Sequence, residues 1–294
     1  MKVLVTGWFS FEQMGASAGD LLARDLVCSW LENAACNYDV AVAPPFSDGV
    51  DWHNCHTDKY SAVIFICGPF GNGPPITEFL EYFSDVPLIG LNLSMLQGLD
   101  VWNPFHLLLE RDSNETRRPD LVFLTQQKKV PVVGLILVQL QEEYGDRAMH
   151  QVADNLLQRL IESRDMAVIP IDTRLDENQT GLRAPCEVES LIAKTDVVIT
   201  TRLHGMVLAI KNGVPPLVVD PIAGGAKILR QAGAIDWPVV FTADKLDQEK
   251  LETALDFCLS GEGRQKAAPV DSGAVGSLVE LQNQLVEGLR DLEA

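Results

Sequence analysis

The side chains of this sequence best suited to chemistry are those of Arg202 and His204, which stand two positions apart. The apolar residues 197–199 before them predict a buried strand, and the apolar residues 206–210 after them predict a helix. In doubly wound α/β domains ligands bind at the carboxyl ends of strands, and a helix N-terminus favours an anion. The pair therefore predicts an anion-binding site, where Gly205 leaves room for close backbone approach. Taken singly, either side chain also fits a surface or capping position.

A longer pattern surrounds this pair. The residues Thr201 to Gly205, T-R-L-H-G, are followed at 209–215 by the pattern A-x-x-x-G-V-P. Together they resemble the signature of the polysaccharide pyruvyltransferase family, whose members transfer pyruvate from phosphoenolpyruvate to a sugar, usually as a ketal. The resemblance implies that Arg202 and His204 are catalytic. It also implies that Leu203 and Gly205 contact the substrate.

The chemistry of phosphoenolpyruvate explains why these residue types suit it. The molecule carries a phosphate and a carboxylate, and the guanidinium of Arg202 can hold such a group through two parallel hydrogen bonds. Its methylene carbon must be protonated before a hydroxyl attacks C2. Histidine is a side-chain type that can exchange protons near neutral pH, so His204 is expected either to donate this proton or to bind the phosphate. This scheme needs no metal and no cofactor, and the helix amides near Gly205 could hold the phosphate.

The family resemblance extends more thinly to other positions. It implies substrate contacts by Gly7 and Asp20, which match the family's Gly-aromatic and Gly-Asp positions. Ser17 stands where the family has an asparagine, and Pro69 interrupts a loop that is glycine-rich in the family. Asp20 is also a good N-cap for a helix over 21–33.

Two further basic residues fit both a site and an ordinary surface. Lys227 stands near a predicted helix start where the family commonly has a lysine that lines the donor pocket, although such lysines are frequent on exposed helices. Arg111 follows a predicted strand where the family has a similar Arg-Asp, and an ion pair with Asp112 or Glu110 would explain it equally well. The acceptor hydroxyl also needs a base, and the sequence leaves Asp20, Glu187 and Glu189 open for this role.

The segment Asp51-Trp52-His53-Asn54-Cys55-His56 gathers residue types that bind metals. It lacks a second cluster of ligands at a recognised spacing, so the sequence favours a polar loop and predicts no metal site. The six cysteines are scattered without a C-x-x-C pair. Reduced thiols in a cytoplasmic protein are therefore expected.

The composition of the chain limits the kinds of partner that it is expected to bind. The net charge is −18 and no basic block stands out, which argues against nucleic acid and anionic lipid surfaces as partners. The longest apolar stretch, 130–138, is far too short to cross a bilayer, although a lipid-linked acceptor is compatible with this. An anionic substrate needs a local cationic pocket within this acidic chain.

The sequence predicts one series of alternating strands and helices before a polar run at 125–129 and a second series after it. This predicts an α/β fold of two Rossmann-like domains facing a cleft, the glycosyltransferase-B-like arrangement that the family is understood to share. We place the acceptor side at 1–127 and the donor side at 128–262. Residues 263–294 are expected to form a linker, within the Gly, Ser, Ala and Pro-rich run 260–276, and a return helix that packs its leucine stripe on the first domain.

Two other functions remain open from the sequence. One is a glycosyltransferase that uses a nucleotide sugar on the same architecture. The other is a non-catalytic binding relative, which the departures at Ser17 and Pro69 would suit. The acceptor, the ketal stereochemistry and the oligomeric state are not specified by the residues.

Overall fold

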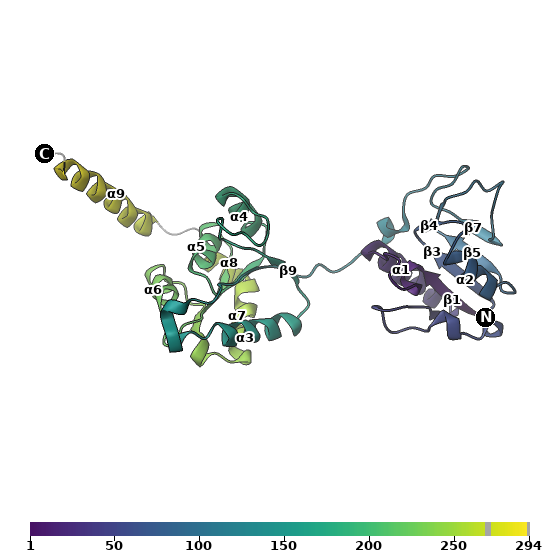
Figure 1. Ribbon diagram of the computed structural model, residues 1–294, viewed down its shortest axis with the longest axis horizontal. Helices are drawn as coiled ribbons and strands as arrows, with labels where there is room; N and C mark the ends of the chain where they lie inside the picture. The colour runs from purple at the N-terminus through teal and green to yellow at the C-terminus, as the bar shows by residue number, and fades with distance from the viewer. Residues whose placement is uncertain (268–271, 293–294) are drawn as a thin grey trace. The chain divides into compact units, whose positions relative to one another are not determined.

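The computed structural model describes residues 1–267 and 272–292, which form two units, Met1–Gln127 and Lys128–Ala294 (Figure 1). Each unit has its own parallel sheet and its own apolar core. The two Rossmann-like α/β domains of the predicted fold class are therefore confirmed.

The first unit is built on a five-stranded sheet in which each neighbouring pair is parallel. The strand order is β2 (Asn37–Val40), β1 (Lys2–Gly7), β3 (Ala62–Ile66), β5 (Leu88–Leu91) and β7 (Leu107–Leu109). The chain adds strands on one side of β1 and then crosses to the other, so a switch point lies between β1 and β3. A second, two-stranded parallel sheet joins β4 (Pro69–Phe70) to β6 (Ser94–Met95).

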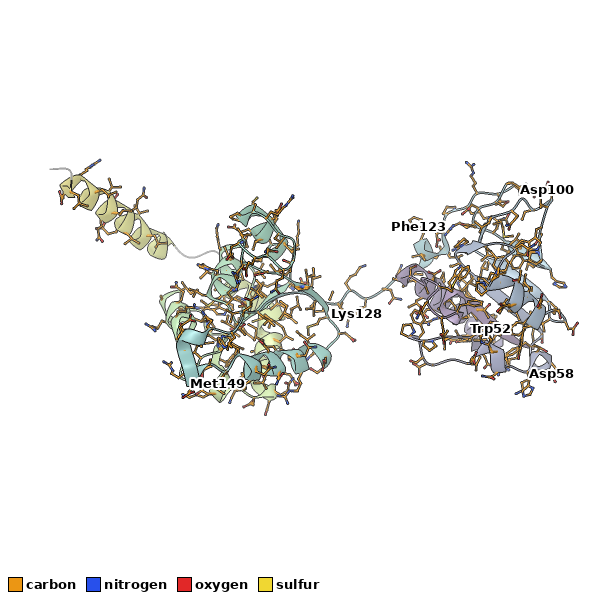
Figure 2. All side chains as sticks on the ribbon, viewed as in Figure 1. Trp52, Asp58, Asp100, Phe123, Lys128 and Met149 are labelled. Carbon is orange, nitrogen blue, oxygen red and sulfur yellow. The ribbon has the colours of Figure 1, made fainter. Side chains whose placement is uncertain are left out.

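Helices cover both faces of this sheet because the strand side chains alternate. Val3 and Val5 pack with α1 (Ala18–Asn33) on one face, and Leu4 packs in the cluster that contains α2 (Ile76–Tyr82) on the other. The second face is rich in aromatic rings, including Trp52, which lies within this unit in Figure 2. Short 3-10 helices complete the unit at Trp8–Ser10, Thr57–Lys59, Trp52–Asn54 and Leu121–Leu124.

The start of α1 corrects one prediction. The helix begins at Ala18, so its N-cap is Ser17 and not Asp20. The carboxylate of Asp20, in the third helical position, accepts hydrogen bonds from the backbone N–H of Ser17 at 2.8 Å and from its hydroxyl at 2.7 Å. This is a capping box, in which two residues satisfy each other's exposed polar groups. It gives both residues a structural role.

The second unit repeats the architecture with a second five-stranded parallel sheet. Its order is β12 (Val240–Thr242), β11 (Pro216–Asp220), β10 (Val197–Thr200), β8 (Val132–Ile136) and β9 (Ala167–Pro170). Here the switch point lies between β8 and β10. Every residue of β10 and β11 is buried, as expected for central strands covered on both faces.

The helices of this unit also lie on two faces. Val197 and Ile199 pack in the cluster that contains α3 and α7, and Val198 packs with Ile192 of α4. The α-helices are α3 (His150–Glu162), α4 (Pro185–Ile192), α5 (Leu203–Lys211), α6 (Lys227–Ala234), α7 (Gln248–Leu259), α8 (Gly261–Lys266) and α9 (Ser272–Leu292), with 3-10 turns at Glu142–Arg147 and Ala243–Lys245. None of the described helices is both long and apolar enough to cross a bilayer.

The C-terminal segment differs from the predicted linker. Residues Gly261–Lys266 form α8, which the hydroxyl of Ser260 caps by accepting a hydrogen bond from the N–H of Gly263 at 3.1 Å. The helix was not predicted because glycine has a low helix propensity. The favourable cap at Ser260 offsets this low propensity. The leucine stripe of α9 is exposed, from 56% at Leu289 to 85% at Leu292. Its packing on the first domain stays a prediction.

All six cysteines are free thiols, and burial separates them into reactive and inert groups. Burial raises the pKa of Cys67 to about 11 and that of Cys258 to about 12, whereas Cys186 is exposed. Because the thiolate is the reactive form, we expect a thiol reagent at pH 8 to label Cys186 first and Cys258 only after unfolding. Mass spectrometry of partly labelled protein would check this, and early labelling of Cys258 would contradict its burial.

Candidate functional site

A pocket of about 250 Å³ lies at the switch point of the second unit. Three of its walls come from the segments that follow β8, β9 and β10, where open α/β sheets bind their ligands. The lining residues are Val138, Gln141, Thr173, Arg174, Thr201, Arg202, Leu203, His204 and Lys227. The structure thus brings four of the predicted site residues, Arg202, Leu203, His204 and Lys227, into one pocket.

Arg202 is fixed in this pocket by the backbone and by a carboxylate. It is the N-cap of α5, and its N–H donates to the hydroxyl of Thr200 at 2.9 Å. Its Nη1 donates to Asp172 at 3.0 Å and to Thr173 at 3.1 Å. The side chains of Arg202 and Asp172 are only 15% and 14% exposed. Arg202 is therefore a positioned cation with a carboxylate partner, while its Nε and Nη2 have no protein acceptor among the described residues.

His204 lies on the open side of the pocket. The helix begins at Leu203, before the apolar residues 206–210 from which it was predicted, so His204 is in the first helical turn and is exposed. Among the described residues no side chain caps the N-terminus of α5. The first amides of a helix lack intrahelical acceptors and carry the positive end of its dipole, so an anion at this position would be stabilised.

Gly205 has a packing role that the sequence did not reveal. The residue is buried, and a Cβ at this position would lie 2.3 Å from the hydroxyl of Thr200 and 3.0 Å from Ile136. The glycine therefore lets α5 approach β10, and the predicted space for a ligand beside it is filled by Thr200 and Ile136. It positions the pocket without lining it.

Lys227 is the first residue of α6, as predicted, and it lines the pocket with an exposed side chain. The N-terminus of α6 is already satisfied, because the buried carboxylate of Asp220 accepts from the N–H groups of Ala226 at 2.7 Å and Leu229 at 3.1 Å. No carboxylate pairs with Lys227 within the part of the chain that the structure describes. Its charge is therefore available to a ligand.

Sequence reasoning missed Arg174 and the carboxylates around it. Arg174 donates to Asp176 at 3.0 and 2.6 Å and pairs with Glu177 at 3.2 Å. These hydrogen bonds lower the pKa of Asp176 to about 2. The loop after β9 lies at the carboxyl end of a strand beside the switch point, and this position was a signal that it lines the site.

The remaining predicted residues are in the first unit and serve its own structure. Arg111 donates from Nε to Asp112 at 2.9 Å, from Nη1 to Asp120 at 2.6 Å, and from Nη2 to Ser94. The ion pair with Asp112, which the sequence offered as an alternative to a substrate contact, is thus present, and this bond lowers the pKa of Asp112. Gly7 ends β1, where a Cβ would lie 2.9 Å from the carbonyl oxygen of Ile66.

Two of the three candidate bases are engaged elsewhere. Glu187 accepts from the backbone N–H of Arg183 at 2.6 Å, and Glu189 pairs with Lys211 at 2.6 Å. Neither lines the pocket at α5. Asp20 belongs to the capping box of α1. The structure thus gives each of the three carboxylates a structural partner.

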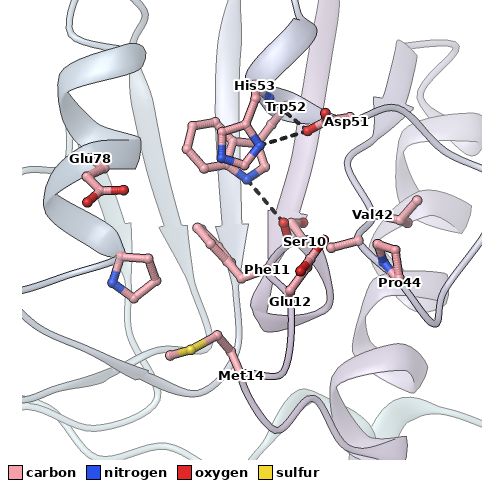
Figure 3. A pocket seen from close by; sticks show the side chains of 12 residues that line it. Ser10, Phe11, Glu12, Met14, Val42, Pro44, Asp51, Trp52, His53 and Glu78 are labelled. Carbon is pink, nitrogen blue, oxygen red and sulfur yellow. Dashed lines mark hydrogen bonds and ion pairs between the residues drawn. The ribbon is translucent and has the colours of Figure 1, made fainter.

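Among the described residues no group of three or more His, Cys, Asp or Glu side chains could hold a metal ion. In the segment 51–56 the imidazole Nδ1 of His53 instead lies 2.8 Å from Oδ1 of Asp51. Residues 51–53 of this segment line a second pocket, in the first unit (Figure 3).

Several solved structures are similar to this chain at a low level. The UDP-GlcNAc 2-epimerase from Methanocaldococcus jannaschii is 11% identical with a TM-score of 0.36, over 97% of this chain and 100% of that chain. The spinosyn rhamnosyltransferase SpnG with its aglycone is 13% identical with a TM-score of 0.33, over 95% and 100%. MurG from Acinetobacter baumannii is 11% identical with a TM-score of 0.33, over 97% and 100%. No curated protein matches the sequence.

A family model does match part of the chain. The match covers residues 119–221, which include the loop after β9, the whole of β10 and α5, and the pocket residues Arg202 and His204. It stops short of Lys227 and excludes nearly all of the first unit. Over residues 119–221 the chain matches the polysaccharide pyruvyl transferase family, which confirms the resemblance that the sequence predicts.

Proposed function

We propose that this protein transfers the pyruvyl group of phosphoenolpyruvate to a saccharide or a related acceptor that bears hydroxyl groups, forming a ketal. The observation that carries the proposal is the pocket at α5, where Arg202, His204 and Lys227 meet an uncapped helix N-terminus. Its volume of about 250 Å³ is below the roughly 300–1,000 Å³ of pockets for drug-sized ligands, so it suits a small anion.

Each cationic group in the pocket has a distinct role in this proposal. Asp172 holds Nη1 of Arg202, so the Nε and Nη2 edge is left to receive the donor carboxylate through two parallel bonds. The phosphate lies at the N-terminus of α5, where Lys227 supplies a charge. Arg174 is less available because Asp176 and Glu177 already neutralise it.

The reaction conserves atoms and charge without an oxidant or reductant. His204 gives a proton to the methylene carbon, which becomes a methyl group, while one acceptor hydroxyl forms a bond to C2. The second hydroxyl then forms the other C–O bond as the bond from C2 to the phosphate oxygen breaks. In sum, the two hydroxyl protons end on the methyl group and on the released phosphate. The scheme requires no metal ion and no organic cofactor.

The six free cysteines support a reducing, cytoplasmic setting for this reaction. The acceptor is a small molecule or the sugar of a lipid-linked carrier, and no nucleic acid takes part.

Ligand-linked stabilisation tests the proposal. Phosphoenolpyruvate at about 100 times its dissociation constant should raise the free energy of unfolding of the wild-type chain by about 2.7 kcal/mol. Thermal unfolding should be recorded with phosphoenolpyruvate, with inorganic phosphate, and with UDP-sugars. Release of phosphate in the presence of methyl glycosides then measures turnover.

Stabilisation by UDP-sugars and not by phosphoenolpyruvate would overturn the proposal in favour of a nucleotide-sugar transferase. Stabilisation by neither donor would leave a binding relative without this activity. Equal stabilisation by phosphate alone and by phosphoenolpyruvate would mean that the carboxylate is not recognised, which contradicts the role given to Arg202.

A further inference from the structure

The pocket at α5 contains a second arginine, Arg174, whose charged edge is already bound by the chain itself. Its Nε donates to Oδ1 of Asp176 at 3.0 Å, and its Nη2 donates to Oδ2 of the same carboxylate at 2.6 Å. Two parallel bonds from one guanidinium to one carboxylate are the arrangement in which arginine binds the carboxylate or phosphate of a ligand. Asp176 therefore fills the place that an anionic ligand would take at Arg174.

Arg174 is held at the pocket by contacts that do not involve this carboxylate. Its backbone N–H donates at 2.9 Å to Oδ1 of Asp172, the same oxygen that accepts from Nη1 of Arg202 at 3.0 Å. Its Nη1 donates to Gln139 at 3.2 Å, and its side chain is only 30% exposed. The amide of Asn178 donates to the carbonyl of Arg174 at 2.5 Å. Both arginines are thus anchored on Asp172, and Arg174 would keep its place without the carboxylate that it binds.

The carboxylates that bind Arg174 are exposed. The side chain of Asp176 is 70% exposed, and that of Glu177, which lies 3.2 Å from Nη2, is 76% exposed. Neither residue lines the pocket. An exposed ion pair contributes little to the stability of a fold, because water solvates both partners when they separate. The carboxylate of Asp176 can therefore leave Arg174 without unfolding the loop that carries it.

We propose that Arg174 is an anion-binding residue of the donor site and that Asp176 occupies it as an internal competitor until the phosphate of phosphoenolpyruvate displaces it. The competition itself does not require the proposed function, but naming the incoming group as the donor phosphate rests on that function. Because Asp176 is close to Arg174 along the chain, its carboxylate competes at an effective concentration on the order of millimolar. A dianionic phosphate that also contacts Lys227 and the amides of α5 outweighs one carboxylate, whereas a weaker anion does not.

Displacement of Asp176 supplies a further cation at the step that needs it. As the bond between C2 and the phosphate oxygen breaks, its electron pair passes to the phosphate, whose negative charge grows. A guanidinium that forms two bonds to this phosphate stabilises the charge and stays protonated throughout. The pocket is therefore less cationic when it is empty than when it holds the donor, so that small anions with a single charge compete poorly for it.

Asp176→Asn is the direct test. Asparagine keeps the size of the side chain but lacks the charge that holds Arg174, and at this exposed loop position the variant should unfold in urea like wild type. We expect its affinity for inorganic phosphate and for phosphoenolpyruvate, measured by calorimetry on the full chain, to rise by roughly twofold to fivefold. Because Glu177 is close enough to Nη2 to replace Asp176, the combination of Asp176→Asn with Glu177→Gln should raise both affinities at least as far.

Further variants separate competition at Arg174 from a change in net charge. Arg174→Gln should lower both affinities by about tenfold or more, because bonds to a charged group are lost. Adding Asp176→Asn to Arg174→Gln should then have no further effect. Asp256→Asn is the matched control, since Asp256 forms the same kind of exposed pair with Arg164, at 2.6 and 3.2 Å, outside the pocket. It removes one negative charge and should bind both anions like wild type.

The outcomes separate this inference from the proposed function. Wild-type affinities in Asp176→Asn and in its combination with Glu177→Gln would overturn the competition, as would a gain that persists without Arg174 or that appears equally in Asp256→Asn. Phosphoenolpyruvate bound and consumed by Arg174→Gln as by wild type would overturn the inference and leave the proposed function intact. A gain in phosphate affinity that requires Arg174, in a protein that neither binds nor consumes phosphoenolpyruvate, would uphold the blocked anion site and overturn the proposed function.

Discussion

His204→Gln should lower turnover by roughly 10²–10⁴-fold and leave most of the affinity for phosphoenolpyruvate, because glutamine can still form hydrogen bonds but cannot deliver a proton at neutral pH. The side chain is exposed in the first turn of α5, so its replacement removes little packing. Donor affinity by calorimetry and phosphate release on the same preparation would separate the two effects. A parallel loss of affinity and rate would identify His204 as a phosphate ligand instead.

Arg202→Lys is the companion variant. It should lower the affinity for phosphoenolpyruvate more than it lowers the turnover of the bound donor. A lysine keeps the charge but cannot offer two parallel N–H bonds while it also holds Asp172. Lys211→Gln is a suitable control, because Lys211 is on the same helix and pairs with Glu189 outside the pocket. If His204→Gln and Arg202→Lys both bind and turn over like wild type and this control, the donor site is not at α5.

Gly205→Ala should destabilise the second unit by on the order of 3 kcal/mol, the upper part of the range for overpacked cores. The new Cβ would lie 2.3 Å from the hydroxyl of Thr200, which donates to the carbonyl of Ile136 at 2.8 Å and accepts from the N–H of Arg202 at 2.9 Å. Relieving the clash would break these bonds and move the N-terminus of α5. Activity should therefore fall along with stability, as measured by urea unfolding and phosphate release.

Gly233→Ala provides the matched control for that substitution. Gly233 is in α6, and a Cβ there meets no atom within 4 Å. Alanine should be neutral or should stabilise the chain by about 0.5–1 kcal/mol, because it restricts the unfolded chain without a clash. Equal unfolding curves for the two variants would show that the contact between α5 and β10 is not as tight as the structure indicates.

The sequence was sufficient where one local pattern determined one element. The run 197–199 is apolar and central, so β10 was predicted closely. The apolar run 206–210 predicted the body of α5, which ends before Asn212-Gly213 with the glycine at φ +70°. The first turn of α5 was missed because Leu203 and His204 precede the apolar run. The start of α1 was misplaced because Asp20 suits both the N-cap and the third position of a capping box, and only the backbone distinguishes them.

The site itself was only partly predictable. Arg202, His204 and Lys227 were chosen because their residue types and positions near helix starts suit an anion, and the structure places them in one pocket. Asp172 and Arg174 were not chosen because their roles depend on which strands are neighbours, and the order β10, β8, β9 is a property of the folded sheet. The contact between His53 and Asp51 was likewise not predicted, because the Cys and His residues of this loop first suggested a metal site.

The carboxylates that accompany the cationic pocket have a consequence for how a donor arrives. Asp172 pairs with Arg202, and Asp176 and Glu177 pair with Arg174, so these two arginines add little positive charge at a distance within a chain of net charge −18. At an ionic strength of 0.1 M, charges act over about 10 Å, so the acidic excess of the chain gives an anion no long-range attraction to the pocket. Its capture therefore depends on random encounter followed by short-range contacts with Lys227 and the amides of α5, and long-range steering contributes nothing to the association rate.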